Sequence, residues 1–479
     1  MTDTTIDQVD AIARAAKDAF AVTSRTDERT RADWLRRAAD AIDADAEGLI
    51  ALAADETALP ASPRLAGELA RTTAQLRLFA KVVEEGSYLE ATIDHPDATA
   101  TPPIPDLRRV LRPLGPVAVF AASNFPFAFS VAGGDTASAL AVGCPVVVKA
   151  HPGHPETSRR MAGVVSAALA EAGAPAGVFA LIEGFDAGLA LVDHPAIRAV
   201  GFTGSVRGGR ALLDRAAARP DPIPFYGELG SLNPVVITPA ADAARGGALA
   251  EGLAGSFQLG AGQFCTKPGV VLVPEGSAVE AALPGLLAPQ GRLLTPSIAE
   301  GFAAGADRVS GTPGVEVVAG DAAPGGTAPR IAAVSAADLV AHADELLEEV
   351  FGPFTLLVRY RDDAERDAVL GAFDGNLTAT LHHEASEDVS DLVTRLEGIA
   401  GRVLFAGWPT GVAVSWAQHH GGPWPSTNAQ FTSVGATAVR RFQRPVAYQD
   451  APEALLPDAL RESNPLGIPR RVDGVLVLP

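Results

Sequence analysis

The sequence predicts an α/β protein in which a parallel, doubly wound sheet is followed by a second α/β domain. From residue 117 onward, short apolar runs alternate with helical stretches, which is the pattern of a parallel sheet with crossover helices. At 479 residues the chain is also too long for one hydrophobic core. The usual size of domains therefore indicates roughly two or three of them.

The N-terminal part of the chain is expected to be helical. Residues 31–53 and 62–85 carry apolar side chains at helical spacing between polar faces. A proline-rich segment at 96–105 interrupts this pattern, because proline lacks a backbone donor and clashes with the preceding helical turn. The parallel sheet is expected to begin after that segment.

The strands of the first sheet are short apolar runs separated by Ala-rich helical segments. We expect strands at 117–123, 145–150, 178–184 and 197–205, and helices at 155–172 and 206–218. In a sheet of this kind the crossovers are right-handed, and ligands bind outside the carboxyl ends of the strands. Functional side chains are therefore expected just after the strands.

A second alternating region follows the first. We expect strands at 233–238 and 269–275 around a helix at 241–257, and a further helix and strand within 336–360. Residues 284–330 are rich in Gly and Pro and are predicted to form loops. The chain then ends in a strand-like tail.

Composition and charge exclude several classes of protein. The formal net charge of −19 argues against nucleic acid or an anionic membrane as the main partner. No apolar run is long enough to span a bilayer, and the acidic N-terminus lacks the apolar core of a signal peptide. Because the only cysteines are Cys144 and Cys265, no disulfide framework beyond one bond is possible, and a cytoplasmic, reducing compartment is expected.

The segment GQFCTKPG (262–269) contains the first candidate for chemistry, Cys265. The flanking glycines allow a backbone to approach a ligand closely, and a partly exposed thiol near N–H groups or a cation is suited to attack a carbonyl. By itself the residue has a simpler explanation, since most free cysteines are small buried hydrophobes. Cys144, just ahead of a strand, fits that explanation well.

Glu228 and Asn124 are the second and third candidates. Glu228 lies among apolar and small residues before a predicted strand, where desolvation raises the pKa of a carboxyl toward the range of a general base. Asn124 follows a strand, so its amide lies on the expected ligand side and can donate to a developing oxyanion. Each also has a structural alternative, a Glu or Asn that bonds a backbone turn.

Two further segments are suited to bind phosphate. VVVKAHPGHPETS (146–158) places Lys149 at the end of a strand. GFTGSVRGGR (201–210) places Gly204 and Ser205 at the start of a helix, where free N–H groups and the helix dipole attract anions. The second segment lacks the G-x-G-x-x-G fingerprint of dinucleotide-binding proteins, so alone it is a weak signal.

In combination, these segments resemble the aldehyde dehydrogenase superfamily over essentially the whole chain. The order and spacing of six places carry the resemblance: Asn124, Lys149, Gly204-Ser205, Glu228, Cys265 and EVFGP (349–353). The resemblance implies an aldehyde dehydrogenase-like α/β fold with a Rossmann-like cofactor domain, a second α/β catalytic domain and a small β oligomerisation element.

The resemblance also implies domain limits and assembly. We expect an NAD(P)-binding domain at 1–91 and 107–230, a catalytic domain at 231–428, and a bridging element at 92–106 and 429–479. Relatives form dimers or tetramers through a hairpin and the C-terminal tail of this last element. A homodimer or homotetramer is therefore expected.

Site roles are carried over from the family residue by residue. Cys265 would attack the aldehyde carbon, with the Asn124 amide and the Cys265 N–H holding the oxyanion, and Glu228 would activate the water that hydrolyses the thioester. The cofactor-binding residues implied are Lys149 for the adenosine ribose or its phosphate, Ser205 with Gly204 for the pyrophosphate, and Glu349 and Phe351 for the nicotinamide ribose and ring.

One departure from the family pattern concerns the cofactor. NAD-preferring relatives usually carry a Glu three residues after the Lys, where it accepts hydrogen bonds from the ribose hydroxyls. Here that position is Pro152, and no acid appears before Glu156. A 2′-phosphate is then not repelled and can pair with Lys149 and His151. NADP is therefore the expected cofactor, with NAD as the other possibility.

The α-ketoglutaric semialdehyde (2,5-dioxovalerate) dehydrogenase branch is the part of the superfamily that the sequence resembles most, for example in RTTAQLRLFA (71–80). That branch oxidises the semialdehyde to 2-oxoglutarate in sugar, sugar-acid and hydroxyproline catabolism. A substrate with a carboxylate and a 2-oxo group needs a cation or several hydrogen-bond donors, and Arg71 and Arg77 are the candidates, although both also fit a plain helix surface. Phe127 and His420 are further candidates to contact substrate, His420 by lining the tunnel or by packing against Trp424.

Two other activities stay open, a broad-specificity aliphatic or aromatic aldehyde dehydrogenase and, from another class, a Cys–Glu thioesterase or esterase. A metal site is not expected. The histidine pairs at 151/154, 382/383 and 419/420 lack the nearby Cys or carboxylate of a zinc site in the sequence.

Overall fold

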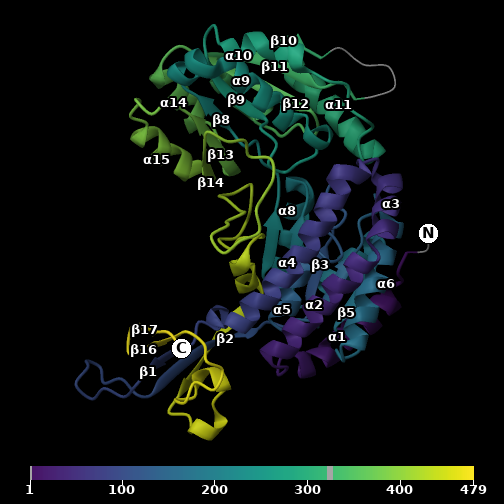
Figure 1. Cartoon of the computed structure of the whole chain (residues 1–479), viewed down its shortest axis with the longest axis vertical. Helices are drawn as coiled ribbons and strands as arrows, with labels where there is room; N and C mark the ends of the chain where they lie inside the picture. The colour runs from purple at the N-terminus through teal and green to yellow at the C-terminus, as the bar shows by residue number, and fades with distance from the viewer. Residues whose placement is uncertain (1–2, 321–326) are drawn as a thin grey trace.

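The computed structural model describes residues 3–320 and 327–479 and contains two large lobes and a smaller projecting sheet (Figure 1). The N-terminal lobe occupies the lower right of the view and the second lobe the top. The smaller sheet projects at the lower left, where the yellow C-terminal strands lie beside β1 and β2. Each of the three parts is organised around its own sheet.

A five-stranded parallel sheet of order β5-β4-β3-β6-β7 organises the N-terminal lobe. Its strands are β3 Val117–Phe120, β4 Val146–Lys149, β5 Phe179–Ile182, β6 Ala199–Thr203 and β7 Phe225–Glu228. The chain adds β4 and β5 on one side of β3 and then β6 and β7 on the other. The change of direction between β3 and β6 is where a doubly wound sheet opens a ligand crevice. The predicted doubly wound parallel sheet is confirmed.

Helices cover both faces of this sheet because alternate strand residues point to opposite sides. Val146 and Val148 pack in the same buried cluster as Trp34 and Phe79, whereas Val147 packs on the other face. The first face is covered by α2 Glu28–Ala44, α3 Ala46–Thr57, α4 Ala66–Glu85, α5 Gly134–Ala141 and α6 Pro155–Glu171. The second is covered by α1 Ile6–Thr23, α7 Phe185–Asp193 and α8 Val206–Ala217.

A seven-stranded sheet of order β10-β11-β12-β9-β8-β13-β14 organises the second lobe. All neighbouring pairs are parallel except β10 with β11. The strands are β8 Val235–Ile237, β9 Val270–Pro274, β10 Glu316–Ala319, β11 Arg330–Ser335, β12 Phe354–Tyr360, β13 Asn376–His382 and β14 Ala400–Phe405. The helices are α9 Pro239–Phe257, α10 Ala278–Ala282, α11 Pro296–Gly311, α12 Ala336–Ala341, α13 Ala343–Leu346, α14 Asp363–Gly371 and α15 Ser390–Ile399.

The projecting sheet has the order β15-β2-β1-β16-β17 and joins the two ends of the chain. Its strands are β1 Thr92–Asp94, β2 Leu107–Pro113, β15 Gln443–Gln449, β16 Arg470–Val472 and β17 Val475–Val477. The predicted limit at residue 107 is wrong, because β2 pairs with β15 along its whole length and so belongs to this sheet. The N-terminal lobe resumes after residue 113, with β3.

Two local predictions also need correction. The helix expected over 31–53 is two helices, because Asp45 has non-helical dihedral angles (φ −102°, ψ 14°) and separates α2 from α3. The loop expected over 284–330 contains α11 and β10, and residues 321–326 of it lie outside the described residues. The side chain of Thr295 accepts from the Ile298 N–H and caps α11. No helix in the described ranges is both long enough and apolar enough to cross a membrane.

Candidate active site

The site lies where the carboxyl ends of the first sheet meet the loops that precede strands of the second. Glu228 is the last residue of β7, and Asn124 follows β3. Cys265 lies between α9 and β9, so it comes from the amino end of a strand rather than from a carboxyl end. The Asn124 Nδ2 donates to the carbonyl of Gln263, 2.9 Å away and two residues before the cysteine. This bond ties the two lobes together beside the thiol.

The backbone before Cys265 has an unusual conformation that glycine makes possible. Residues 260–262 all have positive φ, at 58°, 55° and 68°. A Cβ on Gly262 would lie 2.3 Å from the carbonyl carbon of Gly352, so no larger residue fits there. Downstream, the Asn233 Nδ2 donates to the Cys265 carbonyl at 2.8 Å. Both sides of the cysteine are therefore fixed by packing and by hydrogen bonds.

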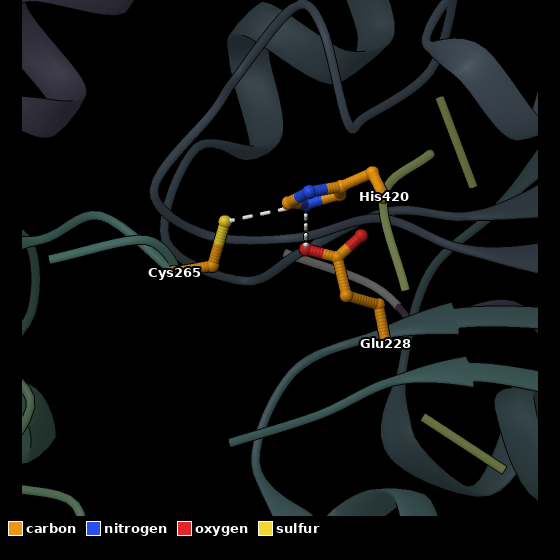
Figure 2. A group of neighbouring side chains, drawn as sticks. All are labelled: Glu228, Cys265 and His420. Atoms are coloured by element: carbon orange, nitrogen blue, oxygen red, sulfur yellow. Dashed lines mark hydrogen bonds and ion pairs between the residues drawn. The ribbon is translucent and has the colours of Figure 1, made fainter. Parts of the chain in front are cut away.

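Three side chains from distant segments converge at the centre of the site (Figure 2). The His420 Nε2 lies 2.8 Å from the Glu228 Oε1 and 3.7 Å from the Cys265 Sγ. The second carboxylate oxygen of Glu228 accepts from the Ser433 hydroxyl at 2.7 Å. His420 therefore lies between the thiol and the carboxylate. The ring that the structure places beside His420 is Phe129, 6.2 Å away between centroids, whereas Trp424, the predicted packing partner, is 43% exposed.

His420 and Ser433 belong to an irregular segment, residues 406–435, that is held against β7. Residue Thr427 forms an isolated bridge with Glu228, and the Leu229 N–H donates to the Ser426 carbonyl at 2.8 Å. Within the segment, the Ser433 N–H donates to the His420 carbonyl at 2.9 Å. These backbone bonds position the imidazole and the hydroxyl on either side of one carboxylate.

Burial and charge set the protonation of the thiol and the carboxylate. Burial raises the pKa of Cys265 well above its ordinary value, and the negative charge of Glu228 raises it further. Burial alone would also raise the pKa of Glu228, but the contacts with His420 and Ser433 outweigh it and lower this pKa. At neutral pH the resting pair is therefore a thiol beside a carboxylate. That is the arrangement in which a base can take the proton of the nucleophile.

Of the two predicted substrate-anchoring arginines, the structure brings only one to the site. The Arg71 guanidinium lies over the Phe129 ring, 5.1 Å from its centroid, and that ring is 6.2 Å from the His420 ring. Its Nε and Nη2 are buried without a hydrogen-bond partner among residues 3–320 and 327–479. Arg77 instead forms ion pairs with Asp40 and Asp43 at the surface. The prediction for Arg77 is therefore wrong.

The phenylalanines around the site also differ from the prediction. Phe127 is fully buried in the core of the first lobe, so its side chain packs there rather than against substrate. Its neighbours Phe125 and Phe129 form an edge-to-face pair 5.3 Å apart, and Phe125 also contacts Phe264, beside the cysteine, at 5.1 Å. Sequence reasoning missed these three rings, although FPFAFS (125–130) contains Phe125 and Phe129, and Phe264 directly precedes the cysteine.

The predicted cofactor side is formed at the carboxyl ends of β4 and β6. Lys149 ends β4, and burial lowers its pKa. Burial also lowers the pKa of His151 to about 3, so this imidazole is neutral near pH 7. Because the His151 Nδ1 accepts from the Gly153 N–H at 3.0 Å, its Nε2 carries the proton. His151 therefore offers a neutral donor, whereas Lys149 offers the charge.

Gly204 and Ser205 form the turn between β6 and α8. The Ser205 hydroxyl accepts from the Gly208 N–H at 3.2 Å and caps α8, so the anion-binding groups here are backbone N–H groups. A Cβ on Gly204 would lie 2.7 Å from the Phe202 ring, so a larger residue here would require that ring to move. This turn is accessible and well suited to a pyrophosphate.

Glu349 and Phe351 precede β12, on the opposite side of the junction. Glu349 approaches the first lobe so closely that a Cβ on Gly230 would lie 3.0 Å from its carboxylate. Burial raises the pKa of Glu349 to about 7, against the lowering effect of Lys267. The Lys267 Nζ donates to the carbonyls of residues Val350 and Phe354, both at 2.9 Å, and fixes this segment. Lys267 was not among the predicted site residues.

Comparison with known proteins decides the family. The sequence model of the aldehyde dehydrogenase family matches residues 1–288. The chain belongs to the aldehyde dehydrogenase family. It is 50% identical to alpha-ketoglutaric semialdehyde dehydrogenase 2 of Azospirillum brasilense, over 97% of this chain and 91% of that protein. It is 42% identical to alpha-ketoglutaric semialdehyde dehydrogenase of Acinetobacter baylyi, over 98% of this chain and 92% of that protein.

The chain is also similar to a solved structure. A variant of proline utilization A from Bradyrhizobium japonicum matches with a TM-score of 0.80 and 25% identity over 94% of this chain. The present aldehyde dehydrogenase spans 45% of that longer chain. As a family member, it is an NAD(P)-dependent enzyme that oxidises an aldehyde to a carboxylic acid.

The residues present in this aldehyde dehydrogenase fit an NAD(P) cofactor. The tight turn at Gly204 exposes the N–H end of α8, and Lys149 lies at the same edge of the sheet. Glu349 reaches this edge from the other lobe. A cation, an anion-binding helix end and a carboxylate are the groups that phosphates and ribose hydroxyls require.

The expectation that the histidines lack Cys or carboxylate neighbours is wrong, because the fold brings both kinds of residue to His420. The donor atoms of Cys265, Glu228 and His420 lie within 4.8 Å of one another. We nevertheless assign these atoms to a hydrogen-bond network. A metal-bound imidazole normally donates its second ring N–H to an acceptor, and the His420 Nδ1 has no such acceptor within the described ranges.

Proposed function

We propose that this aldehyde dehydrogenase oxidises α-ketoglutaric semialdehyde to 2-oxoglutarate through a covalent intermediate on Cys265. Glu228 accepts the proton of the thiol, and the thiolate attacks the aldehyde carbon to form a thiohemiacetal. The oxyanion is held by the Cys265 N–H and by the Asn124 amide. One Asn124 N–H bonds the Gln263 carbonyl, so the other is free to donate.

The second half of the reaction uses the same carboxylate. NAD(P)⁺ held at Lys149, Gly204 and Ser205 would supply the hydride acceptor, and loss of the hydride from the thiohemiacetal leaves a thioester on Cys265. Glu228 first releases the thiol proton to solvent and then removes a proton from a water molecule, which attacks the thioester carbon, and the acid product leaves as the Cys265 thiolate is released. The low pKa of Glu228 keeps it ionised and ready to accept that proton.

The observation that carries the substrate assignment is the buried, incompletely bonded guanidinium of Arg71. Two of its nitrogens have no partner in the described part of the chain, and its charge acts on both Cys265 and Glu228. A buried cation with free N–H groups is expected to bind an anion that enters with the substrate. The carboxylate of α-ketoglutaric semialdehyde supplies such an anion. The two similar enzymes from Azospirillum brasilense and Acinetobacter baylyi carry this substrate in their names.

The preferred cofactor is proposed to be NADP, with NAD as the weaker one. Pro152 provides no carboxylate to repel a 2′-phosphate, and Lys149 supplies a positive charge at the end of β4. His151 adds a neutral Nε2–H donor, because burial holds its pKa near 3. A hydrogen bond plus one charge favours the phosphate without excluding a ribose hydroxyl.

Steady-state kinetics test these assignments together. The purified enzyme is assayed with α-ketoglutaric semialdehyde, succinic semialdehyde and propanal, each with NAD and with NADP. We expect the highest kcat/KM with α-ketoglutaric semialdehyde and NADP. Equal kcat/KM for propanal would indicate the broad-specificity enzyme instead, and a higher value with NAD would overturn the cofactor assignment. Hydrolysis of an ester substrate without cofactor, in place of aldehyde oxidation, would indicate the thioesterase alternative.

A homodimer or homotetramer is proposed to form through the projecting sheet. Its edge strand β17 and the following residue expose four consecutive apolar side chains, with Val475 at 65%, Leu476 at 59%, Val477 at 43% and Leu478 at 69% exposure. An exposed apolar edge strand is a surface that pairs with another chain. Light scattering with size exclusion should give two or four times the chain mass, and deletion of 474–479 should lower it.

The free thiols suit a cytoplasmic, reducing compartment.

A further inference from the structure

His420 occupies a position that the proposed reaction steps do not use. Its ring is fully buried, and its Nε2 faces both reacting groups, Glu228 at 2.8 Å and Cys265 at 3.7 Å (Figure 2). The ring rests 6.2 Å from Phe129, and its backbone N–H donates to the Thr432 hydroxyl at 2.8 Å. A side chain held this firmly between a nucleophile and its base acts on both.

The second ring nitrogen shows which atom carries the proton. The His420 Nδ1 is buried and has no hydrogen-bond partner within 3–320 and 327–479. A buried N–H without an acceptor is costly, whereas a bare ring nitrogen is less so. Nδ1 is therefore the bare ring nitrogen, and Nε2 carries the proton. That N–H points at the ionised Glu228, so Nε2 has no lone pair with which to take the proton of Cys265.

We infer that His420 is a further catalytic residue of this enzyme, a fixed N–H donor that is shared between the Glu228 carboxylate and the Cys265 sulfur. This inference rests on the proposed roles of Cys265 and Glu228. In the resting state the Nε2–H bonds the carboxylate. When the thiol proton passes to Glu228, the negative charge moves from oxygen to sulfur, and the same N–H turns to the thiolate. No proton leaves His420.

This donor makes proton transfer between the two groups less costly in a buried site. Without it, burial and the adjacent carboxylate both disfavour the thiolate. A hydrogen bond to a charged group contributes more than one between neutral groups, and it follows the charge without solvent reorganisation. Ser433 stays on the other oxygen of Glu228 throughout. Ser433 thus serves the carboxylate alone, whereas His420 serves both groups.

Other charged groups also face this centre and remain constant in the tests. Glu349 raises the pKa of the Cys265 thiol, and Arg71 lowers it. The charge of Arg402 also acts on Cys265, from the β14 side. Because substitutions at His420 and Ser433 leave these three groups in place, a change in the titration of the thiol reports on the hydrogen bonds themselves.

The test compares His420→Phe, which keeps a ring but no donor, with His420→Gln, which keeps an N–H donor near Nε2. Ser433→Ala is the matched control, because the Ser433 hydroxyl contacts the Glu228 carboxylate at 2.7 Å and the His420 carbonyl at 3.2 Å and does not touch the imidazole N–H. Alkylation of Cys265 by iodoacetamide is followed against pH in the full-length enzyme without cofactor or aldehyde, and mass spectrometry identifies the modified cysteine. Thermal unfolding confirms that each variant is folded.

We expect His420→Phe to move the midpoint of the alkylation profile up by about one pH unit, the effect of losing a hydrogen bond to a charged group. His420→Gln should restore most of the shift, and Ser433→Ala should leave this midpoint unchanged. In the pH profile of kcat, both His420→Phe and Ser433→Ala should move the acid limb to higher pH. Glu228 must be ionised to act, and each variant removes a donor that holds its pKa down.

Two outcomes overturn the inference. If folded His420→Phe alkylates with the wild-type profile, the N–H does not serve the thiolate. If His420→Gln behaves like His420→Phe, the donor is not the property that matters. If Cys265 were not the nucleophile, Cys265→Ser would still oxidise aldehyde. That result would overturn the proposed function, and it does not depend on the alkylation profiles.

Discussion

Cysteine and arginine side chains have different surroundings at the junction between the two large sheets and in the rest of the first lobe. Away from the junction, Cys144 is fully buried and its thiol donates to the Phe442 carbonyl at 3.4 Å, and Arg77 forms two ion pairs at the surface of the first lobe. At the junction, Cys265 is partly accessible. Arg71 there leaves two nitrogens without partners among the described residues.

This difference separates residues that stabilise the fold from residues that act on a ligand. A buried polar group without a partner costs about 1–3 kcal/mol of folding free energy. Evolution tolerates that cost where a substrate or an intermediate supplies the missing partner. Pairs of identical residues, one in each region, therefore give matched experiments in which the same substitution has different consequences.

The largest contrast is expected between the two cysteines. Cys265→Ala removes the nucleophile and should lower kcat by roughly 10³-fold or more. Cys144→Ala should leave kcat within about twofold and lower the free energy of unfolding by about 1–2 kcal/mol, because it opens a small cavity in the core. Burial raises the pKa of Cys144 to about 11, so at neutral pH it does not react. Strong inactivation by Cys144→Ala would contradict the assignment of Cys144 as a purely structural residue.

The next largest effect is expected at Glu228. Glu228→Gln keeps the size and one hydrogen-bond acceptor but removes the base, and it should lower kcat by roughly 10²–10³-fold. Both thiol deprotonation and thioester hydrolysis need this base, so a rapid-mixing experiment at high pH is informative. There the thiol ionises without help, and a first burst of reduced cofactor should appear while steady turnover stays slow. Unchanged turnover would exclude Glu228 as the base.

The two arginines of α4 give a smaller, substrate-specific contrast. Arg71→Met should raise KM for α-ketoglutaric semialdehyde by roughly 10–100-fold, the effect of losing hydrogen bonds to a charged group. It should leave KM for propanal, which has no carboxylate, within about threefold. Arg77→Met should change neither KM, because its ion pairs lie at the surface and contribute about 1 kcal/mol or less each. An unchanged KM for the semialdehyde in Arg71→Met would end the anchor assignment.

The site residues that follow strands were predictable from the sequence. Asn124, Lys149, Ser205 and Glu228 each lie at or just after the carboxyl end of an apolar run, where a parallel sheet presents its ligand-binding groups. The order of these motifs then indicated the family. Local pattern and global fold agree at these positions, so a single sequence was sufficient to find them.

The remaining site residues depend on contacts that the sequence does not express. Arg71 and Arg77 are six residues apart, which puts them on different faces of one helix, but helical spacing does not say which face meets the second lobe. The placement of His420 depends on backbone bonds between an irregular segment and β7. Phe127 lies in a turn with no periodicity, so the pattern did not reveal which ring is core.

The smallest expected effect concerns Lys149 and the proposed preference for NADP over NAD. Lys149→Ala should raise KM for NADP by roughly tenfold, because it removes the cation proposed to pair with the 2′-phosphate. It should raise KM for NAD by less, since a ribose hydroxyl loses only one neutral hydrogen bond. The ratio of the two values isolates the phosphate from any general loosening of β4. Equal losses for the two cofactors would mean that Lys149 contacts only the ribose, and that the NADP preference needs another source.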